Sequence, residues 1–161
     1  EYEVVELNAE TPSYYSRLNN SKLLDRLHDA LCRHWAGTGS AEDRRMATEV
    51  LQEYGSLTLD SDIMRSKLYV LLLQAYTILD ETSKRESQLM AIQKMLPAVR
   101  AKQSRALLLV TLYGCTDSRL YYDQAHALID PWLAEKSPKK SKAQLIRHLA
   151  DFDREFGHGG E

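Results

Sequence analysis

The five histidines are the first residues to test for metal or acid–base chemistry, and they are dispersed along the chain. His28 and His34 are six residues apart on one expected helix, so they lie on different faces of it. The sequence contains neither His-Glu-x-x-His nor Cys-x-x-Cys, the spacings that place two ligands on one zinc ion. Asp151 and Asp153, two residues apart, would project from opposite sides of a helix. These spacings predict no metal site and no cofactor.

The glycine-containing segment 37–40 does not have the pattern of a phosphate-binding loop. It lacks the lysine and the preceding strand of such loops, and a turn between two helices explains it better. No serine lies in a nucleophile elbow. We therefore predict that the protein is not an enzyme and takes no small-molecule substrate. A helical enzyme domain whose groups come from distant residues is the weaker alternative.

Basic side chains are concentrated in two segments without acidic residues, Ser87 to Thr116 and Lys136 to His148. Such segments can contact RNA phosphates or acidic protein surfaces, and RNA affinity of this kind falls as salt rises. The alternative is a solvated linker and ordinary surface charge. Neither segment is interleaved with exposed aromatics, so base stacking is not expected. The candidate partner or RNA contacts are Arg100, Lys102, Arg105, Lys139, Lys140, Lys142 and Arg147.

The aromatic residues Tyr121, Tyr122 and Trp132 allow two interpretations. In a stack of helical hairpins, such residues usually wedge between repeats. If Tyr121 or Trp132 faces outward instead, it could anchor a partner protein. These two are therefore the candidate interface aromatics.

The composition is that of an ordinary globular domain. The chain has 161 residues, of which 43% are hydrophobic and 27% charged, enough for one buried core. We expect a single domain over residues 1–157 and a flexible tail over 158–161. No apolar stretch approaches the roughly 20 residues that span a bilayer, so no membrane partner is expected.

The ends and the cysteines indicate a cytoplasmic fragment. The first ten residues contain four glutamates and no base, unlike a targeting peptide, and no Met begins the chain. We interpret the sequence as a piece of a larger protein or a processed form. Cys32 and Cys115 fall in expected apolar helix stripes. This favours reduced, buried thiols in a reducing compartment, with a disulfide between them as the alternative.

Two near-continuous apolar runs, Leu68–Leu73 and Ala106–Val110, dominate the hydropathy pattern. Each is followed by a tyrosine, and Tyr76 and Tyr113 are 37 residues apart, within the range of helical-hairpin repeats. A helix that is apolar on nearly every side must be covered by other helices. The pattern therefore predicts a layered helical protein.

Capping and breaking residues divide the chain into about eight helices. Apolar and polar residues rarely alternate, so strands are not expected. The predicted fold class is all-α, a right-handed stack of antiparallel helical hairpins of the TPR or PCI type. Pro97 either kinks or ends the fifth helix. The sixth helix is expected to end at Gly114, and the seventh to begin at Asp117 or Ser118 and to carry Leu120, Ala125, Leu128 and Ile129. The fourth expected helix begins at Asp60 or Ser61. The expected helices cover about 13–18, 21–36, 40–55, 60/61–79, 84–99, 102–113, 117/118–129 and 139–156.

Several segments resemble a known family. Arg105–Tyr113 and Arg119–Leu128 pair an apolar helix ending in tyrosine with a following aromatic-x-x-Ala helix. Upstream, the Tyr-x-x-x-Leu stretch in Pro12–Leu18 leads into Leu24–Leu27. In this order the segments resemble subunit c of eukaryotic translation initiation factor 3, in the helical-repeat region that precedes its PCI module. The resemblance implies a non-catalytic scaffold.

Under this resemblance, the expected function is subunit assembly within initiation factor 3 and docking to the small ribosomal subunit. The expected partners are other protein subunits of a large complex, with ribosomal RNA as a further partner. The alternative is a TPR-like chaperone or adaptor that binds a peptide or a helical client protein. Tyr122–Leu128 also fits the second helix of such a repeat.

Overall fold

The computed structural model describes residues 41–55 and 61–159, and these ranges contain helices and no strand. The predicted all-α class is therefore confirmed, whereas the expected helices 13–18 and 21–36 lie outside the described residues. The chain divides into two compact units, residues up to 88 and residues from 89, and a single domain over 1–157 stays a prediction. The helices are α2 Ala41–Tyr54, α3 Asp62–Ile78, α4 Thr82–Met95, η1 Leu96–Ala98, α5 Lys102–Thr116, α6 Arg119–Ile129, η2 Asp130–Ala134 and α7 Lys140–Phe156.

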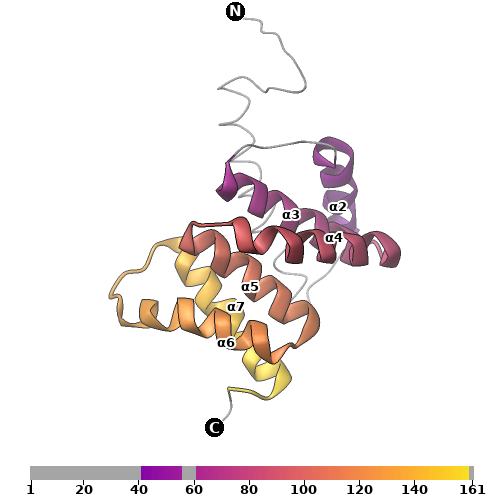
Figure 1. The fold of residues 1–161 in the computed structure, drawn as a ribbon. Coiled ribbons are helices and arrows are strands. Elements are labelled where there is room, and N and C mark those ends of the chain that lie inside the picture. Colours follow the sequence, from indigo (N-terminus) through magenta and orange to yellow (C-terminus); the bar gives the residue numbers. More distant parts are fainter. Residues whose placement is uncertain (1–40, 56–60, 160–161) are drawn as a thin grey trace, which may run out of the picture. The chain divides into compact units, whose positions relative to one another are not determined.

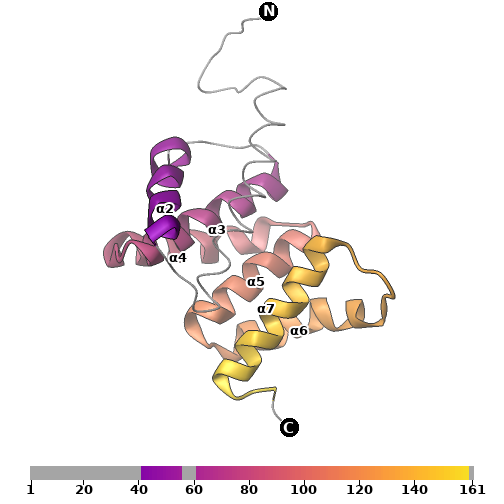
Figure 2. The same cartoon turned by 180° about the vertical axis from the view of Figure 1, so that it is seen from behind.

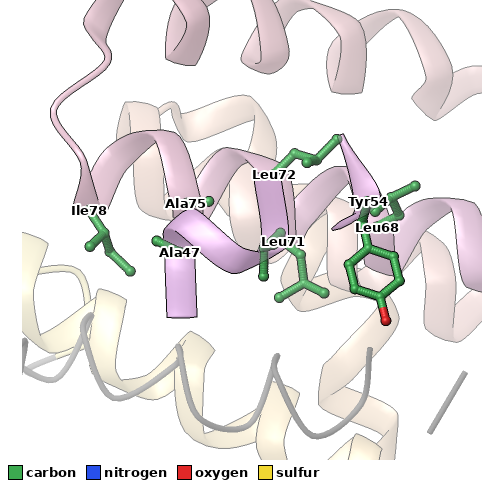
Figure 3. Packing of buried hydrophobic residues seen from close by; sticks show 8 residues of the cluster. Ala47, Tyr54, Leu68, Leu71, Leu72, Ala75 and Ile78 are labelled. Atoms are coloured by element: carbon green, nitrogen blue, oxygen red, sulfur yellow. The ribbon is translucent and has the colours of Figure 1, made fainter. Parts of the chain in front are cut away.

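In the first unit, α2 and α3 form an antiparallel hairpin with an apolar core between them (Figure 3). The Arg44 guanidinium at the start of α2 donates a 2.8 Å hydrogen bond to the carbonyl of Ile78, the last residue of α3. This bond satisfies an acceptor that the end of a helix leaves without a partner. The core consists of Ala47, Val50 and Tyr54 from α2 with Leu68, Leu71, Leu72, Ala75 and Ile78 from α3.

The start of α3 lies at the serine of the two predicted residues, Asp60 and Ser61. Ser61 has extended backbone, and its hydroxyl accepts a 3.5 Å hydrogen bond from the Met64 N–H, which makes it the N-cap. Along the apolar run, Val70, Leu71 and Leu73 are each no more than 1% exposed. The helix is thus buried on nearly every side, as its sequence predicts.

The beginning of α4 runs back along α3 within the first unit. The Gln88 amide donates to the Tyr69 carbonyl at 3.2 Å, and Arg85 Nε donates to Thr77 Oγ1 at 3.0 Å. Asp80, with a φ of 59°, supplies the left-handed backbone of the turn between the helices. The predicted polar break after residue 79 is therefore present.

Pro97 ends the fifth predicted helix and does not kink it. α4 stops at Met95, and the proline lies in the short turn η1. Proline lacks an N–H and its ring clashes with the preceding turn, so an α-helix cannot continue through it undisturbed. Arg105, in the first turn of α5, donates to the carbonyls of Leu96 and Val99 at 3.0 and 3.2 Å. These bonds satisfy acceptors that the interrupted helix exposes.

α5 continues past Gly114, so the predicted helix end at this residue is wrong. The helix runs to Thr116, and Asp117, with a φ of 53°, forms its left-handed C-cap. A Cβ on Gly114 would lie 2.5 Å from Cζ of Phe152 on α7. The glycine therefore serves the close approach of an aromatic ring to the α5 backbone, and not a turn.

α5, α6 and α7 form the three-helix part of the second unit (Figure 1 and Figure 2). Near the starts of α5 and α7, the Ser141 hydroxyl donates to Gln103 Oε1 at 3.5 Å. Near their ends, the Tyr113 hydroxyl lies 2.7 Å from the Asp153 carboxylate. α5 and α7 therefore run parallel, and α6, which packs against both, runs in the opposite direction.

α6 buries one part of its apolar side chains and exposes another. Of the apolar residues expected on this helix, Ala125 and Ile129 are buried, whereas Leu120 is 59% exposed. Five residues along an α-helix correspond to a rotation of roughly 140°, which places Leu120 and Ala125 on different sides. The predicted break at Asp130-Pro131 is confirmed as the turn η2.

The backbone after α7 folds back onto that helix. Gly157, with a φ of 80°, is the left-handed C-cap. The N–H groups of His158 and Gly159 donate to the Asp153 carbonyl at 2.7 and 3.3 Å. The flexible tail expected over 158–161 stays a prediction, and two of its residues are held by these bonds.

Candidate functional site

The buried carboxylate of Asp153 joins α5, α6 and α7 of the second unit. Asp153, on α7, is 6% exposed and accepts a 2.7 Å hydrogen bond from the Tyr113 hydroxyl on α5. Its other oxygen lies 2.7 Å from Nε2 of His126 on α6. Nδ1 of His126 lies 2.8 Å from the Asp130 carboxylate at the end of the same helix. These four side chains are called the Asp153 network below.

The His126 ring is protonated when both of its carboxylate partners are ionised. A neutral imidazole has one donor and one acceptor nitrogen, but here both nitrogens face carboxylate oxygens, which only accept. Burial lowers the pKa of His126, while the hydrogen bonds to Asp130 and Asp153 raise it, and the net effect is an increase. The imidazolium is therefore the form that fits this position.

Tyr113 is a neutral hydrogen-bond donor in this network. Its side chain is fully buried, and burial together with the hydrogen bond to Asp153 raises the pKa of its phenol far above the ordinary value. Tyr122 and Phe156 contact its ring edge-to-face, with centroids 5.4 and 5.3 Å away. An aromatic shell thus separates the Tyr113–Asp153 bond from water.

A second histidine, His158 in the residues after α7, also packs on this aromatic shell. The His158 ring stacks on Tyr113 with centroids 6.1 Å apart, and its Nε2 lies 2.9 Å from Asp117. The guanidinium of Arg119 lies 4.4 Å from the centre of the Tyr122 ring. The end of α5, the start of α6 and the residues after α7 are therefore linked by aromatic and charged contacts.

The Asp153 network holds helices together and has no group directed at a reaction. A general base needs a nitrogen lone pair that can reach a substrate, and both nitrogens of His126 are already engaged. Tyr113 has a raised pKa and is buried, so it is a poor base or nucleophile. What this arrangement can do is fix the helix packing and make stability depend on pH.

The sequence does contain a signal for Asp153. Leu145, Leu149, Phe152 and Phe156 form the apolar stripe of α7, and Asp153 follows Leu149 by four residues, within the same stripe. An acid in such a stripe requires buried partners. The spacing from Asp151 does not reveal this. The partners themselves lie 40 and 27 residues away, beyond any local pattern.

The structure separates the seven predicted basic contacts into two groups. Arg105 is half-buried on the carbonyls beside Pro97, and Lys142 Nζ lies 2.8 Å from Glu135 and 5.2 Å from the centre of the Trp132 ring. Both are engaged within the fold. The side chains of the other five are exposed: Arg100, Lys102, Lys139, Lys140 and Arg147.

The two predicted interface aromatics are not fully exposed. Trp132 is 8% exposed beneath Lys142, and Tyr121 is half-buried. The large exposed apolar side chains of the second unit include Met90, Leu120 and Leu133, which are 66%, 59% and 62% exposed. The most exposed large apolar side chains of α6 and η2 are therefore leucines, and a role of Tyr121 or Trp132 in an interface stays a prediction.

Within 41–55 and 61–159, no three His, Cys, Asp or Glu side chains are placed to hold a metal ion. No helix in these ranges is long and apolar enough to cross a membrane. Cys115 is half-buried on α5, and Cys32 lies outside the described residues, so the redox state of the pair stays a prediction.

The described helices define an all-α protein whose buried polar cluster joins helices to one another. No family model and no curated protein matches the chain. Among solved structures, the fold is similar to that of UpxZ from Bacteroides uniformis, a transcription anti-terminator antagonist. The TM-score is 0.64 at 21% sequence identity, and the match covers 89% of this chain and 98% of that chain. The similarity shows a shared fold.

This similarity corrects the resemblance to subunit c of initiation factor 3. The fold matches an anti-terminator antagonist, so the expected membership in the initiation factor is wrong, and translation initiation is wrong with it. The short motifs suggested the wrong family because packing contacts within this fold are enough to explain their residues. Tyr113 follows the apolar run of α5, where its hydroxyl reaches Asp153, and Tyr122 near the start of α6 packs on its ring. Any helical protein with such contacts would share the pattern.

Proposed function

We propose that this chain is a non-catalytic, cytoplasmic helical protein that antagonises a transcription anti-terminator by binding a protein partner. The observation that carries the proposal is the fold similarity to UpxZ, which extends over 98% of that chain. The match also covers 89% of this chain, so it extends over more than one hairpin. The proposal is also a specific case of the adaptor function that the sequence suggests, a helical protein with one protein client.

The chemistry of the second unit supports binding and not catalysis. Its buried acid, imidazole and phenol satisfy one another, so none of them is directed at a small molecule. Its exposed surface carries large leucines at positions 120 and 133 and nine exposed Lys and Arg residues. Surfaces of mixed apolar and charged character are those through which proteins recognise other proteins.

The test is a transcription assay on a template with a terminator, using RNA polymerase and an anti-terminator from the organism that encodes the chain. Adding the purified protein should reduce anti-terminator-dependent readthrough in a dose-dependent manner. Readthrough in reactions without the anti-terminator should not change. Unchanged readthrough at a large molar excess of the protein over the anti-terminator would contradict the proposal.

A surface variant locates the contact. Leu120→Asp combined with Leu133→Asp places charge on two exposed side chains, so the helical fold should persist. We expect this variant to keep its circular dichroism spectrum and to lose antagonism. The matched control is Ile63→Asp, which changes a 50% exposed apolar residue of the first unit.

The finer architecture predicted from the sequence also belongs to this proposal. A right-handed stack of hairpins through about eight helices requires the segments 13–18 and 21–36 to form the first layer. An experimental structure of the whole chain tests this. A first layer packed on α2 and α3 would support the stack, and a different arrangement would exclude it.

A further inference from the structure

The residues after α7 fold back onto the end of that helix. Gly157 is the left-handed C-cap, and the N–H groups of His158 and Gly159 both donate to the Asp153 carbonyl, at 2.7 and 3.3 Å. Asp153 therefore holds this segment through its backbone, while its side chain holds α5 and α6. Residues 157–159 are called the clasp below.

Glycine is required where the clasp passes over Asp153. A Cβ on Gly159 would lie 2.8 Å from Cβ of Asp153, closer than two such atoms approach one another in proteins. Gly157, with a φ of 80°, takes a backbone conformation that other residues rarely adopt. The clasp is therefore a fitted element of the fold.

The His158 side chain ties the clasp to α5 and α6. Its Nε2 lies 2.9 Å from the carboxylate of Asp117, the C-cap of α5. Its ring stacks on Tyr113 with centroids 6.1 Å apart, and its centroid lies 5.1 Å from that of Tyr122. The side chain is 25% exposed, so water can reach the imidazole. The ring can therefore exchange protons with solvent while the clasp is closed.

The contact with Asp117 becomes stronger when His158 gains a proton. A carboxylate only accepts hydrogen bonds, and a neutral imidazole can donate one from Nε2 in one of its tautomers. Protonation therefore adds the charge of an ion pair to a hydrogen bond that the neutral ring can also make. A positive charge stacked on the Tyr113 ring is favoured in addition.

Among the described residues, the other groups around His158 come from α5, α6 and α7. α5 and α6 present Tyr113 and Tyr122, whose phenols are ordinarily neutral near pH 7, and α7 presents the apolar Phe156, with centroids 6.4 Å apart. The Arg119 guanidinium lies 4.4 Å from the centre of the Tyr122 ring and opposes a second positive charge there. An acid of its own helix pairs with this guanidinium at 3.4 Å, which weakens the opposition.

The Asp153 network adds a second histidine to the same aromatic ring. His126, held by Asp130 and Asp153, contacts Tyr122 with centroids 4.6 Å apart. His158 contacts this ring as well. Because each histidine is held by carboxylates of its own, substitutions can separate the effects of the two.

We propose that the clasp is a pH-sensitive device that opens locally when His158 loses its charge. Two backbone hydrogen bonds, one ion pair and ring contacts hold it closed, whereas α5, α6 and α7 share buried side chains. Segments with few buried contacts open at much lower free energy than a core. The ion pair favours closure while the imidazole is charged, so closure weakens as the pH rises through the histidine range of about 5 to 8.

Opening of the clasp changes the surface at the start of α6. It removes His158 from the Tyr122 ring, which lies two residues after the exposed Leu120. The helices themselves stay packed, because the Asp153 side chain still binds both of its partners. This inference holds whether or not the chain antagonises an anti-terminator.

The experiment measures amide hydrogen exchange of the full chain by NMR between pH 6 and pH 8. Rates are expressed as protection factors, which remove the dependence of the intrinsic exchange rate on pH. The protection factors of the His158 and Gly159 amides should fall about 3- to 10-fold over this range, since a tenfold change corresponds to one pKa unit. The amide of Leu109, in the middle of α5, should stay at least about 100-fold better protected, which shows that the opening is local.

Two conservative variants remove the ion pair from either side. His158→Gln keeps a donor for the carboxylate but cannot become charged. Asp117→Asn removes the partner charge, and asparagine tolerates the left-handed C-cap. Both variants should keep the circular dichroism spectrum and abolish the fall in protection between pH 6 and pH 8. The matched control is Asp123→Asn, which removes an exposed carboxylate paired with Arg119 and should leave the fall unchanged.

Two further variants separate the clasp from the Asp153 network. His126→Gln should keep the fall in protection at residues 158 and 159, because the His158 ion pair is intact. Gly159→Ala should open the clasp at every pH, because the methyl group overlaps Cβ of Asp153, and should lower protection at pH 6 at least to the wild-type value at pH 8.

Three results would overturn the proposal. The first is a wild-type protection factor at residues 158 and 159 that does not change between pH 6 and pH 8. The second is a fall that persists in both His158→Gln and Asp117→Asn. The third is a fall that disappears in His126→Gln while His158→Gln keeps it, which would assign the pH dependence to the Asp153 network.

Discussion

The hydroxyl of Tyr113 donates a 2.7 Å hydrogen bond to the carboxylate of Asp153, and this bond joins two helices that run in the same direction. The chain returns from the end of α5 to the start of α7 through α6, which runs in the opposite direction. His126 of that helix takes up the second oxygen of Asp153. One carboxylate therefore fixes the register of α5, α6 and α7.

Asp153→Asn should lower the free energy of unfolding by about 2–4 kcal/mol. The amide keeps the volume of the side chain but removes the negative charge that pairs with His126 and accepts from Tyr113. The matched control is Asp151→Asn, whose ion pair with Arg154 is exposed and should contribute less than about 1 kcal/mol. Urea denaturation of both variants measures the difference, and equal losses would contradict a special role for Asp153.

Stability should decrease as the pH rises above about 6.5. The pKa of His126 is raised in the folded state, so its contribution is complete below the unfolded pKa of about 6.5 and disappears as the pH passes the folded pKa. Urea denaturation between pH 6 and pH 9 measures this slope, well below the titration of Tyr113. In His126→Gln the slope should be much smaller, and an unchanged slope in the variant would show that another group causes it.

His148 should act in the opposite direction. Burial and the neighbouring Arg147 lower the pKa of His148, although Asp151 partly opposes them. Its contribution is therefore complete above a pH of about 6.5 and is lost as the pH falls through the lowered folded pKa. Between pH 6.5 and pH 5, His148→Gln should lose stability less steeply than the wild type in the same denaturation series. Parallel curves would refute this assignment.

Gly114→Ala should destabilise the fold by about 1–3 kcal/mol, because the new methyl group overlaps the Phe152 ring. Phe152→Leu in the same chain should recover part of this loss relative to the sum of the two single changes. Gly157→Ala serves as the comparison, since open space surrounds that position and only its left-handed backbone is strained. Thermal denaturation of the four variants separates steric overlap from backbone strain.

Leu109→Ala should cost about 2–5 kcal/mol, because the side chain is 1% exposed and its removal leaves a cavity in the second unit. Leu120→Ala removes the same atoms from a side chain that is 59% exposed and should change stability by no more than about 0.5 kcal/mol. Similar losses for the two variants, measured by urea denaturation, would mean that α6 packs with another face than the one described.

Much of the fold follows from patterns that are local in the sequence. The serine before α3, the proline after α4 and the apolar run of α5 mark these helices because caps, breaks and apolar periodicity act within a few residues. Gly114 shows what a local pattern cannot predict. A glycine near a helix end has the same local pattern whether it forms a turn or admits a ring from another helix.

The candidate site was harder to predict because its members come from three helices. His126 looks unremarkable in its own segment. Asp153 stands out as an acid in an apolar stripe, but only the packing of α6 on α7 gives each of the two its partner. The basic residues can be recognised in the sequence, but the sequence does not show which of them are engaged within the fold and which are exposed. Arg105 and Arg100 are five residues apart, and the reach of Arg105 to the Leu96 carbonyl depends on how the chain turns at Pro97.

The parallel pairing of α5 and α7 has a kinetic consequence. α5 and α6 are joined through residues 117 and 118 alone, so their contacts can form early. α7 reaches α5 only after a loop of 40 residues closes between Tyr113 and Asp153, and such closure loses chain entropy before any contact compensates. We therefore expect α7 to dock last. Weakening its contacts at Asp153 would then speed the opening of the folded chain more than it slows its formation.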